Sequence, residues 1–257
     1  MAAWVRFSDG ARVAFGTLSG DTITVHDGDM FSGAVATGEQ KSLASVRLLA
    51  PCQPSKMLCL WNNFHALAAK LGVAEPAEPL YLLKAPSAFM ATGEAIRRPP
   101  SYDGKIVYEG ELGIVIGKAC SNASEAEAAS SIFGYTCVND ITAADIISKD
   151  STFAQWTRAK SFDTFGIFGP AIVTGLDPAK LSVRTVLNGA ERQNYALNDM
   201  IFPPAALVSA ISRDMTLMPG DVIACGTSLG VGVMKEATNV VEVSIEGIGT
   251  LHNTFAQ

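Results

Sequence analysis

The chain has 257 residues, of which 48% are hydrophobic and 17% charged, so it has enough apolar material for one large globular unit and little for disorder. Its net charge of −6, with 19 lysines and arginines and no basic run, argues against nucleic acid or an anionic membrane as a partner. The N-terminus lacks a long apolar segment, and the five cysteines are scattered without a CxxC pair. We therefore expect a cytoplasmic protein without disulfides or a finger-type zinc site.

The first 50 residues predict a small β-rich unit. Apolar and polar residues alternate through WVRFSDGARVAFGTLSGDTITVHDG, with turn signals at Asp9-Gly10 and Gly20-Asp21. The following stretch, APCQPSK, has the composition of a linker. We therefore predict an N-terminal β-rich domain over residues 1–52 and a larger domain over residues 53–257.

Two elements and a loop are expected after the linker. The run FHALAAKL predicts a helix from Phe64 to Leu71, and prolines at positions 76 and 79 would end it. The run LYLLKAPSAFM predicts a strand over residues 80–90, and residues 93–105 read as a proline-rich polar loop.

The stretch YEGELGIVIGK begins an unusual strand. Because side chains at i and i+2 share a face, Glu109 and Glu111 should project side by side, on the face that carries Val115. The remainder of the strand is apolar at both parities, which indicates burial on both faces.

The rest of the chain is again rich in strands. Ser124 and Glu127 have capping-box spacing for a short helix that would stop at Gly134, and the next strand, YTCVND, ends at Asp140. A hairpin is expected at Asn188-Gly189, and VVEVSI alternates as a half-buried strand. The predicted fold class is α+β, dominated by β-strands.

The three acidic residues allow two interpretations. A lone Glu-x-Glu is more often a solvated strand end than a site. Buried carboxylates must be paired or bind a metal, however, and Asp140 ends the strand that follows Glu109 and Glu111. An all-oxygen set of ligands suits a hard cation, with Mg²⁺ or Mn²⁺ as first candidates and Ca²⁺ as a third.

Lys160 lies in QWTRAKSFDTFGIFGP, among aromatic and small residues. It could be a surface lysine whose stem lies over Phe162, or an ammonium group beside the metal that stabilises negative charge. The spacing alone does not favour either interpretation.

Six motifs, in this order, resemble the fumarylacetoacetate hydrolase superfamily: YEGELGIVIGK, GYTCVNDITAAD, QWTRAKSFDTFGIFGP, LNGAERQ, TLMPGDVIACGTSLGVG and VEVSIEGIGTLHN. The resemblance covers about residues 57–254, and the N-terminal residues resemble the small extra domain of many bacterial members. It implies a mixed β-sandwich roll, usually dimeric, with a Mg²⁺ or Mn²⁺ site.

The resemblance also assigns roles to residues. The metal ligands would be Glu109, Glu111 and Asp140, with Lys160 as a catalytic residue and Thr164 near the metal. Thr227, in a GTS turn where the family has GTP, would contact the substrate, and Asn63 would join it in substrate binding.

The family's substrates are 2-oxo or 2,4-dioxo carboxylates. The expected reaction is hydrolytic C–C cleavage of an acylpyruvate-like compound through an enolate stabilised by the metal. The alternatives are a decarboxylase or an isomerase or tautomerase, acting on oxaloacetate or a 2-hydroxy-diene-dioate, and a non-catalytic binder of oxo acids.

The chain departs from the family at the group that activates water. Hydrolytic members carry a histidine and a glutamate in a motif resembling NYxxHxxE, whereas this chain has NNFHALAAK. Aligned without a gap on Asn63-Phe64, those positions hold Leu67 and Lys70. If His65 is taken as the histidine instead, Ala68 stands at the glutamate position, so the glutamate is missing in either alignment. His65 is then the only plausible catalytic imidazole, and Glu75 or Glu78 would have to supply the missing carboxylate. Ala144 stands where many relatives have an arginine.

Overall fold

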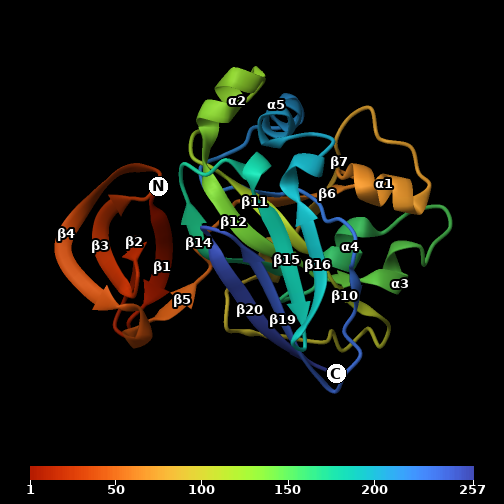
Figure 1. Cartoon of the computed structure of the whole chain (residues 1–257), viewed down its shortest axis with the longest axis horizontal. Coiled ribbons are helices and arrows are strands. Elements are labelled where there is room, and N and C mark those ends of the chain that lie inside the picture. Colours follow the sequence, from red (N-terminus) through yellow and green to blue (C-terminus); the bar gives the residue numbers. More distant parts are fainter.

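The computed structural model describes residues 1–257 and contains one large sheet of twelve strands (Figure 1). Its main path runs through β4 (Ser32–Ser42), β3 (Thr22–Asp29), β2 (Val13–Ser19), β1 (Ala3–Ser8), β14 (Gly166–Val173), β12 (Ile132–Asp140), β11 (Gly110–Ile116), β17 (Val222–Ala224), β6 (Met57–Trp61) and β7 (Leu80–Lys84). Two short strands lie off this path, β5 (Arg47–Leu49) beside β1 and β8 (Phe89–Met90) beside β14.

Two smaller sheets complete the strand structure. The five-stranded sheet has the order β16 (Ala190–Ala196), β15 (Ser182–Leu187), β19 (Thr238–Ile245), β20 (Gly249–Ala256) and β9 (Ala95–Ile96). The three-stranded sheet has the order β13 (Thr142–Ala143), β10 (Ile106–Tyr108) and β18 (Gly232–Val233). The hairpin predicted at Asn188-Gly189 joins β15 to β16.

The helices are short. They are α1 (His65–Leu71), α2 (Glu125–Ser131), α3 (Ala144–Ile147), α4 (Trp156–Lys160) and α5 (Pro204–Asp214), with single 3₁₀ turns at Leu43–Ser45, Pro86–Ala88, Pro178–Lys180 and Leu197–Asp199. None of them is long and apolar enough to cross a membrane. Strands therefore dominate an α+β fold of packed sheets, as predicted.

The large sheet has an inner and an outer face. On the inner face, alternate residues of β11 such as Leu112 and Ile114 join the main core, and β11, β12 and β14 pack against the five-stranded sheet. On the outer face, Val115, Val138 and Phe168 belong to a second, smaller core. All seven residues of β11 are buried, which confirms the predicted burial on both faces.

The N-terminal strands extend the large sheet instead of standing apart from it. β1 pairs with β14 in antiparallel register, with Ala3 opposite Val173 and Trp4 opposite Ile172. Figure 1 shows these strands curling away at the left of the molecule. The predicted boundary between residues 52 and 53 falls between β5 and β6.

The predicted strand over residues 80–90 is wrong as a single element. β7 ends at Lys84, a 3₁₀ turn starts at Pro86, and β8 covers only two residues. Proline fixes its own φ and lacks a backbone N–H, so it favours the turn over a continued ladder. The loop predicted over 93–105 contains the short strand β9, which pairs with β20.

The predicted cap of α2 is confirmed, but its predicted stop is wrong. Ser124 and Glu127 form the capping box, and the helix ends at Ser131. Gly134 lies inside β12, where an added Cβ would lie 2.5 Å from the Val173 carbonyl oxygen. That glycine therefore allows the close approach of β12 to β14 and does not terminate the helix.

Candidate metal centre

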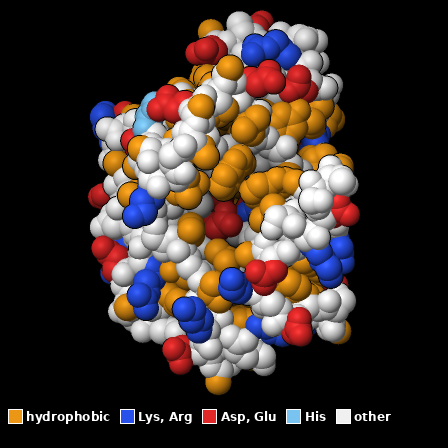
Figure 2. All heavy atoms as spheres, turned by 90° about the vertical axis from the view of Figure 1, so that its right-hand side faces the viewer, with side chains coloured by type: hydrophobic (Ala, Val, Ile, Leu, Met, Phe, Trp, Pro, Cys, Tyr) orange, Lys and Arg blue, Asp and Glu red, His pale blue; other side chains and the backbone are white.

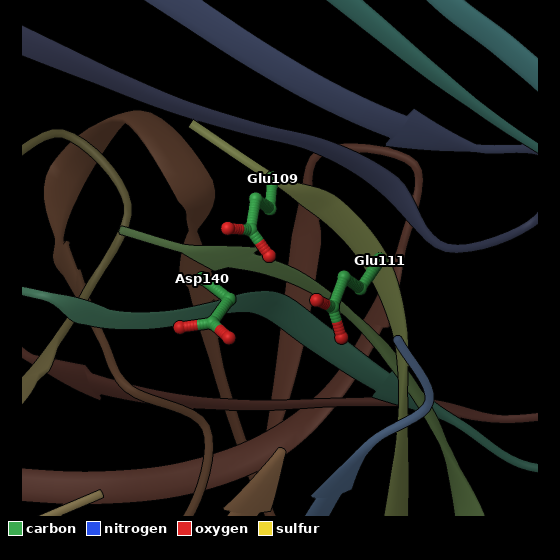
Figure 3. A group of neighbouring side chains, drawn as sticks. All are labelled: Glu109, Glu111 and Asp140. Carbon is green, nitrogen blue, oxygen red and sulfur yellow. The ribbon is translucent and has the colours of Figure 1, made fainter. Parts of the chain in front are cut away.

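Three acidic side chains meet on the outer face of the large sheet. Glu109 lies in the break between β10 and β11, Glu111 lies in β11, and Asp140 ends β12. Their carboxylates point toward one another (Figure 3), and each offers an oxygen within 4.8 Å of the others. Strand register explains the meeting, because Glu111 is paired with Val138, and Asp140 follows Val138 by two residues on the same face.

The cluster lies deep in the molecule. Glu111 and Asp140 are fully buried, whereas the Glu109 side chain keeps 18% of its surface exposed. Figure 2 shows acidic side chains at the floor of a hollow framed by hydrophobic ones. The carboxylates are therefore largely withdrawn from bulk water while remaining open on one side.

The ammonium group of Lys160 lies among these carboxylates. It donates hydrogen bonds to Asp140 Oδ2 at 2.6 Å, Glu109 Oε2 at 3.0 Å and Thr142 Oγ1 at 2.8 Å. The side chain is buried at the end of α4, so the alternative of a surface lysine is excluded.

A second buried lysine, Lys84, was missed by the sequence interpretation. Its ammonium lies 2.5 Å from Asp140 Oδ1, although not aligned as a hydrogen bond, and it donates to three backbone carbonyls. These belong to Ile141 at 3.2 Å, Lys160 at 2.5 Å and Phe165 at 2.9 Å. The available signal was a lysine at the end of the otherwise apolar run LYLLK. Lys84 ties β7 to the segments that carry Asp140 and Lys160.

Burial and charge shift the pKa values within the cluster. Burial raises the pKa of Glu111 well above its ordinary value, and the charges of Asp140 and Glu109 raise it further. Burial alone would also raise the pKa of Asp140, but Lys160 and Lys84 outweigh it and the net shift is downward. Burial would lower the pKa of Lys160, yet the carboxylates reverse this and raise it. Lys160 therefore keeps its proton, and Glu111 is the carboxylate without a compensating cation.

The residues fit a hard divalent cation. Glu111 Oε2 accepts a 2.8 Å hydrogen bond from the backbone N–H of Gly226, but Glu111 Oε1 is buried without any hydrogen-bond partner. An unpartnered buried carboxylate oxygen facing two further carboxylates is costly unless a cation joins them. Glu109, Glu111 and Asp140 would hold such an ion, and their all-oxygen chemistry matches Mg²⁺ or Mn²⁺.

We expect Glu111→Gln to stabilise the metal-free protein by about 1 kcal/mol at pH 8, or about 2–4 °C in Tm. The raised pKa means that native Glu111 still holds its proton where the unfolded chain has released it. Stability of the metal-free protein should therefore fall as pH rises from the ordinary glutamate range through that raised pKa. Glutamine removes this dependence.

Thermal scans of both proteins between pH 5 and 9, with EDTA and with Mg²⁺, test this prediction. Mg²⁺ should raise the Tm of the native protein, increasingly at higher pH because binding displaces a proton, and should do little for the variant. A variant whose Tm falls at every pH would mean that the Glu111 charge is satisfied within the protein.

Two predicted substrate-binding residues lie in the loops beside Glu111. Asn63 donates to the carbonyls of Cys225 at 2.9 Å and Phe202 at 3.3 Å, and its Oδ1 accepts from the Phe202 N–H at 2.9 Å. Its side chain therefore holds two loops together. Thr227 donates to the Gly110 carbonyl at 3.0 Å and accepts from Gln193 Nε2 at 2.8 Å, which places it against the strand that carries Glu111.

The remaining two predicted residues make contacts away from the carboxylates. Thr164 Oγ1 accepts a 2.9 Å hydrogen bond from the Arg97 N–H, and Thr164 itself has a φ of +71°. His65 Nδ1 lies 2.5 Å from Glu75 Oε1, and both side chains are about half exposed. Glu75 is thus the carboxylate that partners His65.

Comparisons with known proteins agree with this architecture. The family model described as "Fumarylacetoacetate (FAA) hydrolase C-terminal" matches residues 56–256, and one described as "Rv2993c-like, N-terminal" matches residues 3–51. Protein Rv2993c of Mycobacterium tuberculosis is 44% identical over 226 residues, which are 87% of this chain and 83% of the relative.

Two relatives carry names that describe a reaction. Oxaloacetate tautomerase YisK of Bacillus subtilis is 36% identical over 225 residues, with 82% of this chain and 74% of the relative covered. The crystal structure of 2-hydroxyhepta-2,4-diene-1,7-dioate isomerase from Mycobacterium marinum superposes with a TM-score of 0.90 at 39% identity, covering 100% of this chain and 98% of that one. The chain belongs to the fumarylacetoacetate hydrolase family.

Proposed function

We propose that the protein is a divalent-metal-dependent enzyme that interconverts the keto and enol forms of a 2-oxo carboxylate, as a tautomerase or double-bond isomerase. The observation that carries this proposal is which residues α1 has at the two motif positions that activate water in hydrolytic members. Leu67, at the motif position of the water-activating histidine, is buried in the main core, and Lys70 stands at the position of the glutamate. Enolisation needs no activated water, so an enzyme that lacks this histidine and glutamate can still enolise its substrate.

The names of the relatives support the same choice. Oxaloacetate tautomerase and 2-hydroxyhepta-2,4-diene-1,7-dioate isomerase describe shifts of a proton and a double bond. The sequence alone had favoured hydrolysis, with this chemistry as its alternative.

The residues of the centre divide the work. Glu109, Glu111 and Asp140 would hold the divalent ion, which would supply Lewis-acid polarisation of the substrate carbonyl. Lys160 keeps its proton and places a fixed positive charge beside the position where enolate charge develops. Lys84 holds Asp140 from the opposite side, and burial keeps the charges in a medium of low dielectric constant.

Hydrolysis of an acylpyruvate is the second candidate, and one contact favours it. His65 and Glu75 form a histidine–carboxylate pair of the kind that activates water, although Glu75 comes from the loop after α1 and not from the next turn.

A substrate panel tests the proposal. The purified protein is incubated with Mg²⁺ or Mn²⁺ and one substrate at a time. With oxaloacetate, the enol absorbance and the release of carbon dioxide are measured. With acylpyruvates, the loss of the dioxo absorbance is measured. We expect metal-dependent tautomerisation that EDTA abolishes. Cleavage of acylpyruvates without tautomerisation would make the enzyme a hydrolase, and bound oxo acid without turnover would make it a binder.

We expect His65→Ala to change kcat/KM for tautomerisation by less than about threefold. The pair is half exposed, and no hydrogen bond joins it to the carboxylate centre. A general base normally contributes 10²–10⁴-fold. Steady-state kinetics of His65→Ala, with Glu75→Gln as the matched control, measure this. A loss of a hundredfold or more in both variants would establish the pair as the proton-transfer machinery.

A further inference from the structure

Two tryptophans stand beside the carboxylate centre on the outer face of the large sheet. In the β6–β7 pairing, Cys59 lies opposite Leu82 and Met57 opposite Lys84. Opposed residues share a face, and Lys84 reaches Asp140, so this is the face of the carboxylates. Trp61, two residues after Cys59, lies on the same face.

Strand register places Trp61 level with Glu111. Gly113, Ala224 and Cys59 form one row across β11, β17 and β6. One step of two residues along each strand leads to Glu111, Gly226 and Trp61, and the hydrogen bond from the Gly226 N–H to Glu111 Oε2 marks this row. At about 4.8 Å between neighbouring strands, the backbones of Trp61 and Glu111 are about 10 Å apart.

The position between them has no side chain. Gly226 has a φ of +88°, and a Cβ there would lie 3.3 Å from the Leu60 carbonyl oxygen, so the site favours glycine. Between the metal-binding carboxylates and the Trp61 indole, the floor of this row is therefore bare backbone.

Trp156 supplies the second ring. It begins α4 and Lys160 ends it, so the two side chains share a helix face at i and i+4. The Trp156 and Trp61 rings lie 5.1 Å apart between centroids, and Trp61 remains 36% exposed. The pair forms an apolar wall near the carboxylates, consistent with the hydrophobic frame of the hollow in Figure 2.

The charged groups nearby are already engaged. Lys84 forms an ion pair with Asp140 and donates to backbone carbonyls. Lys160 donates to Asp140 and Glu109. Arg158 donates to Gln155 Oε1 at 2.9 Å, and at two positions from Trp156 on α4 it does not share that residue's helix face. The wall itself therefore offers the substituent an aromatic, uncharged surface.

We propose that Trp61 and Trp156 bind the substituent on C3 of the substrate, and that the preferred substrate is a 2-oxo carboxylate whose C3 carries a branched aliphatic or aromatic group and not a second carboxylate. This rests on the proposed function, because the 2-oxo carboxylate end is taken to bind at the carboxylate centre. The tryptophan pair then sets specificity by apolar burial of that substituent beside the carboxylate centre.

The substrate preference can be tested by measuring the same reaction, hydrogen–deuterium exchange at C3, for every 2-oxo acid, with NMR in D₂O at saturating Mg²⁺. We expect kcat/KM to be about tenfold higher for 4-methyl-2-oxopentanoate than for pyruvate, and higher than for oxaloacetate. Trp61→Ala and, independently, Trp156→Leu should lower kcat/KM for 4-methyl-2-oxopentanoate about tenfold, to the level of pyruvate, which carries no C3 substituent. Leu80→Ala is the matched control, because Leu80 lies opposite Trp61 but one strand further from Glu111.

A binding readout separates the two proposals. The chain has three tryptophans, so in Trp4→Phe the fluorescence comes from Trp61 and Trp156 alone. With Mg²⁺ present, 4-methyl-2-oxopentanoate should change that fluorescence at lower concentration than pyruvate or oxaloacetate. If none of the acids exchanges hydrogen for deuterium at C3 but 4-methyl-2-oxopentanoate still binds most tightly, the enzymatic proposal fails and the proposed apolar wall stands. Equal binding of all three acids, or an equal loss for every substrate in Trp61→Ala, would overturn the wall.

Discussion

Replacing Lys160 with methionine is expected to lower kcat for enolisation about 100- to 1,000-fold without weakening Mg²⁺ binding. Two effects of the same charge explain the split. The ammonium lies within 3.0 Å of Glu109 and Asp140, so its field opposes the arrival of a cation at those carboxylates. The same field stabilises negative charge on an enolate, and methionine removes the charge and its hydrogen bonds while keeping a side chain of similar length.

Isothermal titration with Mg²⁺ and single-substrate kinetics measure the two effects separately. Lys118→Met is the control, because Lys118 is an exposed lysine just beyond β11. The assignment fails if Lys160→Met loses metal affinity and activity in proportion, since Lys160 would then act only by holding the carboxylates in place. Full activity in the variant would remove Lys160 from the reaction altogether.

Replacing Asp140 with asparagine is expected to lower the free energy of unfolding by about 3–5 kcal/mol. Asp140 is fully buried between two ammonium groups, with Lys84 at Oδ1 and Lys160 at Oδ2. Asparagine would leave two buried cations with one carboxylate fewer, and breaking a buried ion pair from one side leaves uncompensated charge.

Glu109→Gln is the matched control for this effect. Glu109 is partly exposed and contacts only one of the two lysines, so its substitution should change stability by about 1 kcal/mol or less. It should still weaken Mg²⁺ binding by about tenfold or more, because one anionic ligand is lost. Urea unfolding in EDTA, with metal titration of the folded proteins, checks both. Equal stability of the two variants would show that Asp140 does not balance the buried lysines.

Local sequence determined several elements because their causes are local. The capping box of α2 depends on Ser124 and Glu127, three residues apart, and the turn at Asn188-Gly189 depends on adjacent residues. Alternation and apolar runs indicated the strands, and β11 is buried on both faces as expected. Where a glycine or proline had two possible roles, sequence interpretation chose wrongly at Gly134 and missed the break at Pro86, because neighbours distant in the chain decide between those roles.

The candidate centre divides in the same way. Two glutamates at i and i+2 in a buried strand, followed by an aspartate at the end of the next strand, indicated a carboxylate cluster, and the family resemblance favoured it over a solvated strand end. The place of Lys160 and the whole role of Lys84 were not predictable, because their contacts join segments that are 18 to 81 residues apart.

The sequence by itself therefore determined the family, the β-rich fold class and the three carboxylates, since periodicity and motif order are properties of neighbouring residues. Only the tertiary structure decided which cations balance those carboxylates, that Glu75 partners His65, and that Trp61 lies on the sheet face of the carboxylates. The physical reason is strand register. The pairing of β11, β17, β6 and β7 is set by the packing of the whole sheet, and that register places Glu111, Gly226 and Trp61 in one row.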